Sequence, residues 1–159
     1  MPSDMKVVYT AEATTEGGRS GRVRTSDGRL ATPLAVPPEL QGDGGPGTNP
    51  EQLFAAGYAA CFHSAVSTVA DGRRLDVSRS TVTARVSLGQ RGPRGFGLAV
   101  VLELRDDALT PADAGALMAA AHELCPYSKA IRGNVPVELL ANGHPIAVDG
   151  SVKHGDGCC

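Results

Sequence analysis

The 159-residue chain lacks any strong excess of charge, since 15 Lys and Arg stand against 17 Asp and Glu, for a formal net charge of −2. This balance gives no electrostatic reason to expect a nucleic acid or an anionic membrane as a partner. The N-terminus, MPSDMKVVYT, lacks the apolar core of a secretory signal, which predicts a cytoplasmic protein. Internal repeats are also missing, and a chain of this length needs only one hydrophobic core.

Cysteine is scarce as well, with four residues: Cys61, Cys125, Cys158 and Cys159. In a reducing cytosol, so few cysteines indicate catalytic, metal-binding or inert thiols rather than a disulfide framework. The C-terminal residues could chelate a metal, but their spacing matches no standard zinc site. We therefore expect no metal, and we predict a single domain over residues 1–150 followed by a flexible tail over 151–159.

One long stretch, from Leu53 to Ala70, lacks formal charge altogether. Asn49 and Pro50 can cap and begin a helix, and Asp71-Gly72 can end it, so the stretch predicts a largely buried helix with Cys61 near its middle. About 18 uncharged residues approach the length of a bilayer span. The stretch is rich in small residues, however, and such residues favour close packing against another helix. We therefore predict a core helix and no membrane partner.

The remaining patterns predict an α+β fold in which an N-terminal β-meander precedes two Cys-bearing helices packed against a mostly antiparallel sheet. Asp27-Gly28 favours a tight hairpin, and the Pro- and Gly-rich residues 33–48 indicate a surface loop. Thr110 and Pro111 can begin a second long helix, which Pro126 interrupts next to Cys125. The strands are predicted over 7–14, 22–25, 29–32, 77–88, 96–105, 135–140 and, more weakly, 146–148, and a short helix is predicted over 127–132.

Chemistry could be carried by the cysteines, although inert core thiols remain an alternative because free Cys is among the most buried residue types. Cys125 precedes a helical turn, where backbone N–H groups favour a thiolate. Arg19, between glycines, could supply a nearby cation, and Glu51 could hold its guanidinium through a bidentate pair. The alternatives are a solvated Arg19 and a capping-box Glu51.

Two histidines lie near the cysteines in sequence. His122 comes three residues before Cys125 and shares its helical face, so it is a minor candidate for tuning that thiol. His63 comes two residues after Cys61 and points to nearly the opposite side of the helix, so we do not expect it to act as a base there.

Three segments together resemble the organic hydroperoxide resistance proteins, the Ohr branch of the OsmC/Ohr family: TNPEQLFAAGYAACFHSA around Cys61, HELCPYSKAIRGNVPV around Cys125 and GGRSGRVRTSDGRL near the N-terminus. The resemblance extends from Val7 to about Val148. It implies an intertwined homodimer with the OsmC/Ohr-like fold, and a thiol peroxidase that reduces organic hydroperoxides. It also implies that a lipoylated protein or dihydrolipoamide is the reductant, and no cofactor is expected.

The resemblance assigns roles to four residues. Cys61 matches the peroxidatic position and Cys125 the resolving position, while Arg19 and Glu51 match the pair that keeps the peroxidatic thiol ionised and orients the peroxide. A Cys61 sulfenic acid would condense with Cys125 to a disulfide, which a dithiol then reduces. An apolar substrate pocket around the thiol is predicted from four residues: Leu53, Phe54, Tyr58 and Phe62.

Helix arithmetic raises a question about Glu51. Ten residues separate it from Cys61, which corresponds to roughly 15 Å along a straight helix and to different helical faces. We therefore predict that Glu51 reaches Cys61 from the neighbouring subunit, unless the helix begins later or bends. Two other functions remain open, namely an OsmC-type peroxidase with a broader peroxide range and a non-enzymatic redox-sensing or hydrophobic-ligand-binding protein of the same fold.

Overall fold

A computed structural model of the chain describes residues 5–147. Backbone contacts divide the chain into two compact units, with the boundary between Leu53 and Phe54. One long helix contributes residues to both units. The predicted single domain stays a prediction, and the predicted tail over 151–159 lies outside the described residues.

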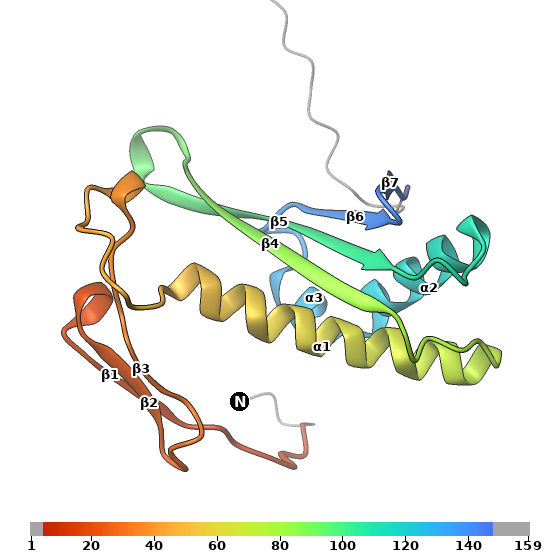
Figure 1. Ribbon diagram of the computed structural model, residues 1–159, viewed down its shortest axis with the longest axis horizontal. Helices are drawn as coiled ribbons and strands as arrows, with labels where there is room; N and C mark the ends of the chain where they lie inside the picture. The colour runs from red at the N-terminus through yellow and green to blue at the C-terminus, as the bar shows by residue number, and fades with distance from the viewer. Residues whose placement is uncertain (1–4, 148–159) are drawn as a thin grey trace, which may run out of the picture. The chain divides into compact units, whose positions relative to one another are not determined.

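The first unit contains a three-stranded antiparallel sheet in the order β1-β2-β3 (Figure 1). Its strands are β1 (Ala13–Glu16), β2 (Arg22–Thr25) and β3 (Ala31–Pro33), and the short 3₁₀ turn η1 (Gly18–Ser20) joins the first two. Gly28 has a φ of 72°, as a tight Asp-Gly turn requires, so the predicted meander and hairpin are confirmed.

The first strand begins later than the predicted range of 7–14. Residues 5–12 are exposed, and no strand among the described residues pairs with 7–12. Because a β-strand requires a hydrogen-bonded neighbour, the β-prone residues Val7, Val8 and Tyr9 remain outside the sheet of this single chain.

The Pro- and Gly-rich segment after β3 is a loop, as predicted, with one 3₁₀ turn, η2 (Pro38–Leu40). Backbone hydrogen bonds close the loop at its base, from Ala35 N to Thr48 O (2.8 Å) and from Thr48 N to Pro33 O (3.0 Å). Asn49 follows, and its Oδ1 accepts a hydrogen bond of 2.9 Å from Gln52 N. This is the predicted cap of the first long helix.

The first long helix, α1 (Pro50–Arg73), begins at the predicted residue and ends slightly beyond the predicted stop. Arg74 adopts a left-handed conformation with a φ of 57°, and Leu75 N donates to Ala70 O at 3.0 Å to close the helix end. By length and composition alone, α1 is the one helix in residues 5–147 that could cross a bilayer. One of its faces is nevertheless fully buried at every fourth residue, at Tyr58, Phe62, Val66 and Ala70, as expected of a core helix.

The second unit contains a four-stranded sheet in the order β4-β5-β6-β7. Its strands are β4 (Thr81–Gln90), β5 (Phe96–Arg105), β6 (Val137–Ala141) and β7 (His144–Pro145), and the 3₁₀ turn η3 (Gly92–Arg94) joins the first two. β5 and β6 run parallel, while the other two pairs are antiparallel. Two of the three pairs are thus antiparallel, as predicted, and the one parallel pair makes the sheet mixed, because two helices carry the chain back between β5 and β6.

Strand boundaries in this unit differ by a few residues from the predicted ones, except for β5. β4 begins at Thr81 rather than at residue 77, because Ser80 N donates to Val77 O (3.0 Å) and residues 77–80 form a turn. β6 begins two residues later than predicted, and β7 precedes the weak strand that was predicted at 146–148.

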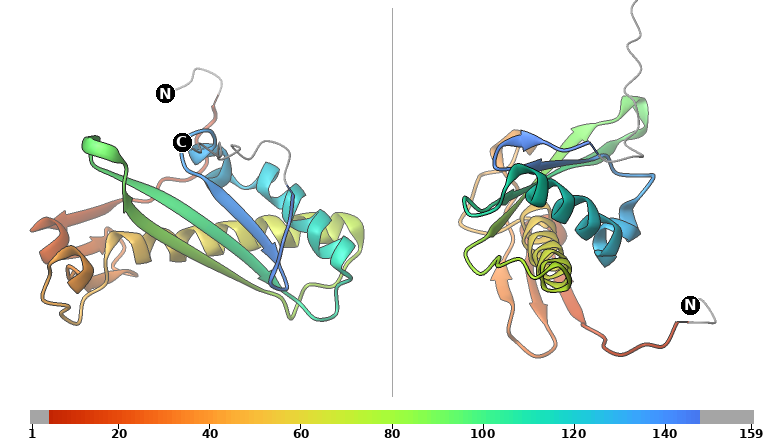
Figure 2. Two further views of the ribbon diagram at one scale, coloured as in Figure 1. Left: turned by 90° about the horizontal axis from the view of Figure 1, so that it is seen from above. Right: turned by 90° about the vertical axis from the view of Figure 1, so that its right-hand side faces the viewer.

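The two connecting helices are α2 (Pro111–Leu124) and the short α3 (Pro126–Ile131). Thr110 caps α2, since its Oγ1 accepts a hydrogen bond from Asp113 N at 3.1 Å. α2 and the part of α1 in the second unit lie on the same face of the sheet (Figures 1 and 2). The core between them includes Phe62 from α1, Leu117 and Met118 from α2, and Leu102 and Leu139 from the sheet. The predicted packing of the two Cys-bearing segments is confirmed.

Candidate active site

Two thiols that are 64 residues apart in sequence meet in the second unit. The Sγ atoms of Cys61 and Cys125 lie 3.5 Å apart. Cys125 is fully buried, whereas Cys61 is partly exposed, and neither is in a disulfide. This difference in access already distinguishes the two thiols, because only Cys61 can be reached directly by a reagent from solvent.

The interruption between α2 and α3 places the Cys125 thiol. Cys125 has an extended backbone (φ −60°, ψ 124°), as the ring of Pro126 demands of the residue before it. Its N–H still donates to Ala121 O (2.8 Å), and its carbonyl accepts from Lys129 N (3.0 Å). Cys125 therefore ends α2 and begins α3, and the predicted break at this position is confirmed.

Burial within the second unit works against ionisation of Cys61. It raises the pKa of the Cys61 thiol, and the neighbouring Cys125 also raises it. The backbone N–H of Tyr127 acts in the opposite direction, because it donates toward the Cys61 sulfur and favours the thiolate. The net direction is upward, so a neutral-pH thiolate requires a cation in addition to these groups.

The first unit contains the predicted bidentate pair. Arg19 Nη1 donates to Glu51 Oε2 at 2.9 Å, and Nη2 donates to Oε1 at 2.6 Å. The two hydrogen bonds from Arg19 hold the pKa of the Glu51 carboxyl below its usual value. Glu51 is therefore not a capping-box acid, and the hydroxyl of Thr48 instead donates to Gln52 Oε1 (2.8 Å).

Local geometry at Arg19 depends on its glycine neighbours. Gly17 and Gly18 have φ values of 74° and 56°, which favour glycine, and they form the turn that presents the arginine. The Arg19 side chain is 41% exposed and the Glu51 side chain 15% exposed. The guanidinium is thus held firmly by one carboxylate while part of it remains accessible.

The four residues of the predicted substrate pocket differ in exposure. Tyr58 and Phe62 are fully buried, so in this chain they form core behind the thiols, while Leu53 and Phe54 are only partly buried. Tyr58 packs against Phe54 and Phe62, with ring centroids 5.9 and 6.3 Å apart. The substrate pocket itself stays a prediction.

Sequence reasoning missed two residues beside the thiols, Tyr127 and Ser128. Tyr127 supplies the N–H near Cys61, and its ring lies 5.8 Å from that of Tyr58. The Ser128 hydroxyl is fully buried and lies 2.8 Å from the Tyr58 hydroxyl. The available signal was their position in the turn that follows Cys125-Pro126.

Neither histidine candidate bonds to a cysteine among the described residues. His63 Nε2 lies 2.9 Å from Ser80 Oγ, which agrees with the prediction that it does not serve Cys61 as a base. Burial, followed by the charge of Arg132, lowers the pKa of His122, and its Nδ1 has no hydrogen-bond partner in the described part of the chain. His122 therefore favours the neutral form, which does not supply the cation that Cys61 requires.

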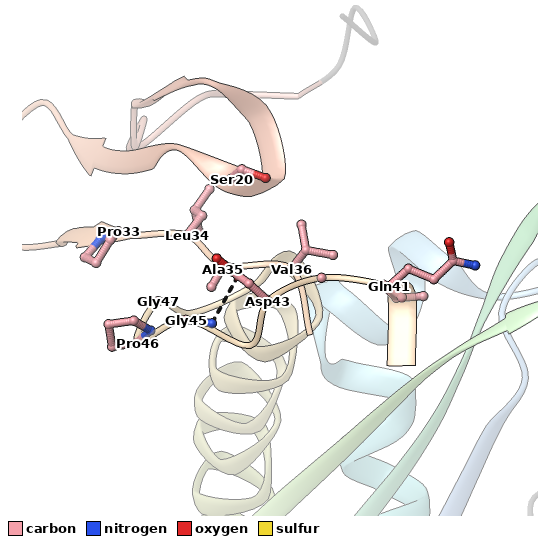
Figure 3. Close-up of a pocket in the computed structure, with 12 residues that line it drawn as sticks. Ser20, Pro33, Leu34, Ala35, Val36, Gln41, Asp43, Gly45, Pro46 and Gly47 are labelled. Atoms are coloured by element: carbon pink, nitrogen blue, oxygen red, sulfur yellow. Dashed lines mark hydrogen bonds between the residues drawn. The ribbon is translucent and has the colours of Figure 1, made fainter. Parts of the chain in front are cut away.

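A separate open depression of about 540 Å³ lies in the first unit (Figure 3). Its wall consists of Ser20 and the loop after β3, and the one hydrogen bond drawn there runs from Gly45 N to Asp43 Oδ1 (3.2 Å). No thiol lines it, so it does not provide the chemistry described above. No cluster of His, Cys, Asp and Glu within residues 5–147 could hold a metal ion.

Comparison with known proteins places this chain in a defined class. Residues 42–140 match the model of the OsmC-like protein family. The chain is 48% identical over 140 residues to an organic hydroperoxide resistance protein of Xanthomonas axonopodis pv. citri, an alignment that covers 87% of this chain and 98% of the relative.

Solved structures agree with this result. An organic hydroperoxide resistance protein from Legionella pneumophila is 50% identical, with a TM-score of 0.81 over 86% of this chain and 98% of the other. A putative one from Vibrio cholerae, with captopril bound in one of its active sites, is 43% identical, with a TM-score of 0.83 over 90% and 98% of the two chains. The chain therefore belongs to the organic hydroperoxide resistance proteins, the Ohr branch of the OsmC/Ohr family.

Proposed function

We propose that this chain is a Cys-based peroxidase that reduces organic hydroperoxides to alcohols and takes its electrons from a lipoyl dithiol. The observation that carries the proposal is the 3.5 Å separation of the Cys61 and Cys125 sulfur atoms. Two thiols at this distance can form a disulfide after one of them has been oxidised.

The first step takes place at Cys61, the more accessible of the two thiols. Its thiolate attacks one peroxide oxygen, an S–O bond forms as the O–O bond breaks, and the departing alkoxide takes up a proton to leave as the alcohol. Cys61 is now a sulfenic acid. Cys125 attacks that sulfur, the disulfide forms, and water leaves.

A dithiol then restores both cysteines by thiol–disulfide exchange and is itself oxidised to a disulfide. We propose dihydrolipoamide, free or carried on a lipoylated protein, for this role. A dithiol suits a largely buried disulfide, because its second thiol resolves the mixed disulfide without the entry of another molecule. Overall, one hydroperoxide and one dithiol give one alcohol, one water and one cyclic disulfide.

Arg19 is proposed as the cation that Cys61 requires. Burial raises the pKa of the Cys61 thiol, and a guanidinium near the sulfur would lower it again. The same guanidinium could donate to the peroxide oxygen on which negative charge develops. Glu51 would orient this cation through the two hydrogen bonds that already join the pair.

The active form is proposed to be a homodimer. Four apolar side chains near the N-terminus are strongly exposed in the single chain, namely Met5 (57%), Val7 (49%), Val8 (89%) and Tyr9 (78%). A second copy could cover these side chains and pair with the segment over 7–12, which has strand character but no strand partner here. Light scattering coupled to size exclusion tests this, and a monomer at micromolar concentration would contradict it.

A peroxidase assay with cumene hydroperoxide and dihydrolipoamide tests the proposed activity. Sustained consumption of the hydroperoxide with one dithiol oxidised per peroxide is the expected result, and hydrogen peroxide is the comparison substrate. Equal efficiency with hydrogen peroxide would favour the OsmC-type alternative. Oxidation of the cysteines without turnover would favour the redox-sensing alternative.

A further inference from the structure

A buried hydrogen bond joins the two segments that carry the cysteines. The hydroxyl of Tyr58, on α1, lies 2.8 Å from the hydroxyl of Ser128, on α3, and both residues are completely buried. The proposed chemistry does not use either hydroxyl. Two polar groups kept in a core in this way require an explanation, because apolar side chains of similar shape would fill the same space.

Each residue of the Tyr58–Ser128 bond lies three positions from one of the two cysteines. Tyr58 comes three residues before Cys61, so the two share one face of α1. Ser128 comes three residues after Cys125, on the short helix that Cys125 begins. The hydroxyl pair and the thiol pair therefore link the same two segments, one beside the other.

The other contacts between α1 and α3 are mainly apolar and less directional. The Tyr127 ring lies so close to Gly57 that a Cβ on that glycine would be 3.2 Å from the Tyr127 hydroxyl. The same ring is 6.2 Å from that of Phe54. Stacked rings permit sliding, whereas a hydrogen bond fixes distance and direction. The backbone N–H of Tyr127 also donates from α3 toward the Cys61 sulfur on α1, but sulfur is a weaker acceptor than a hydroxyl oxygen.

The far end of α3 is tied to α2 instead of α1. Arg132 donates to the Glu123 carboxylate (2.7 Å) and to the carbonyl of His122 (3.1 Å). These bonds join the end of α3 to α2 and do not involve α1. The bond between Tyr58 and Ser128 joins α3 to α1, together with the bond from Tyr127 N–H toward the Cys61 sulfur.

The bond persists over the pH range in which a peroxidase operates. Burial raises the pKa of Tyr58 to about 12, so the phenol keeps its proton at neutral pH. Either hydroxyl can act as the donor, and neither is expected to change its charge there.

We propose that Tyr58 and Ser128 are positioning residues whose hydrogen bond holds the Cys125 thiol against Cys61, so that the sulfenic acid forms a disulfide before a second hydroperoxide can oxidise it. This inference rests on the proposed function. In the protected route, the sulfenic acid and the Cys125 thiol give a disulfide and water. In the competing route, the sulfenic acid and a second hydroperoxide give a sulfinic acid and an alcohol.

The test compares Tyr58→Phe, Ser128→Ala and the double variant with wild type. Each is treated with increasing cumene hydroperoxide, and mass spectrometry gives the ratio of sulfinic acid to disulfide at Cys61. We expect this ratio to rise at least about fivefold in each single variant, while the rate of the first oxidation in Ser128→Ala, which alters no residue of the predicted substrate pocket, changes less than about twofold. The ratio in the double variant should be close to that in the single variants, because both substitutions remove the same bond.

Ser80→Ala is the matched control. Ser80 is also a buried serine bonded to a side chain of α1, in this case His63, and the other bond of its hydroxyl in the described residues goes to Val77 O, away from the Cys125 segment in sequence. The Ser80→Ala variant should lose about as much thermal stability as Ser128→Ala. Its ratio of sulfinic acid to disulfide at Cys61 should stay at the wild-type value. If Ser80→Ala raised the ratio as much as Ser128→Ala, general loosening of the core would be the cause and the inference would be overturned.

A second measurement needs no hydroperoxide. The reduction potential of the Cys61–Cys125 couple, set with dithiothreitol buffers, reports how well the two thiols are held together. A fivefold loss of effective concentration would raise the potential by about 21 mV, since a tenfold change corresponds to 29.6 mV. Unchanged potentials and oxidation ratios in both single variants would overturn the inference. If wild type consumed no hydroperoxide, the proposed function would fail, and the potentials alone would decide the positioning role.

Discussion

The Sγ atoms of Cys61 and Cys125 lie 3.5 Å apart, although the first is partly exposed and the second completely buried. A disulfide bond is about 2.05 Å long, so the atoms must move together by only about 1.5 Å when it forms. The contact thus joins a thiol that a reagent can reach, Cys61, to a buried thiol, Cys125. We therefore expect different effects from substituting the two cysteines.

Cys61→Ser should abolish hydroperoxide consumption, whereas Cys125→Ser should consume about one equivalent and then stall or overoxidise. The reason is that only the first thiol must meet the peroxide, and the second is needed to release the sulfenic acid as a disulfide. Stopped-flow measurement of peroxide consumption on the two variants checks this. The roles are reversed if Cys125→Ser loses the first turnover while Cys61→Ser retains it.

Arg19→Ala should shift the titration of Cys61 to higher pH. Burial and Cys125 both raise the pKa of this thiol, and loss of the proposed cation leaves that effect uncompensated. The rate of alkylation by iodoacetamide against pH measures the thiolate fraction, and its midpoint should move upward. Arg19→Lys should be intermediate, because an ammonium keeps the charge but not the bidentate geometry.

Arg29→Ala is the control for this titration. Arg29 is 90% exposed and pairs with Asp27 on the surface, so its removal should leave the midpoint unchanged. A midpoint in Arg19→Ala equal to that of wild type and Arg29→Ala would exclude Arg19 as the cation.

The sequence predicted the helix around Cys61 well because its signals are local. Asn49 caps the helix and Pro50 begins it, and both act within one turn of the chain. The break at Cys125-Pro126 was equally predictable, since it follows from the shape of the proline ring.

The parts that could not be predicted depend on residues far apart in the chain. Whether β6 pairs parallel or antiparallel with β5 depends on how α2 and α3 return the chain, and strand patterns do not encode this. The bond between Tyr58 and Ser128 joins residues 70 positions apart, and a buried Tyr and Ser carry no signal that they face each other. The segment over 7–12 has strand residues but pairs with no strand within residues 5–147, so propensity alone gave the wrong boundary for β1.

Organic hydroperoxides should be preferred over hydrogen peroxide by at least about one to two orders of magnitude in kcat/KM. Burial of an alkyl tail contributes roughly 0.8 kcal/mol per methylene, and hydrogen peroxide has no tail to bury. A series of linear alkyl hydroperoxides of increasing length provides the measurement, with a rise in kcat/KM at each added methylene until the site is filled. If kcat/KM did not change with the length of the alkyl chain, the result would count against an apolar pocket near Cys61.

Phe62→Ala should lower the free energy of unfolding by about 3–5 kcal/mol, because it leaves a cavity in the core next to the cysteine-bearing turn of α1. Urea denaturation followed by circular dichroism measures the loss. Phe96→Ala is the matched control, because Phe96 is 63% exposed at the start of β5. Its substitution should lower the free energy of unfolding much less. Equal losses would contradict the placement of Phe62 in the core.

The last prediction concerns which subunit supplies Glu51 to each site. α1 is a single helix that begins at Pro50, so the alternative of a later start does not apply. Ten residues of helix separate Glu51 from Cys61, which is roughly 15 Å of rise and a turn onto another face. We therefore expect each site of the proposed dimer to combine Cys61 of one subunit with Glu51 of the other.

Mixed dimers test this expectation through complementation. A heterodimer of a Cys61→Ser subunit and a Glu51→Ala subunit contains, if sites are shared, one site with both residues intact and one with neither. Two impaired parents should then give a heterodimer with about half of the wild-type activity, because one of its two symmetry-related sites is complete. Separate affinity tags on the two subunits allow the heterodimer to be isolated and subunit exchange to be verified. If each site is built within one chain, every site in that heterodimer still lacks a residue, so verified exchange without any recovery of activity would reject the shared site.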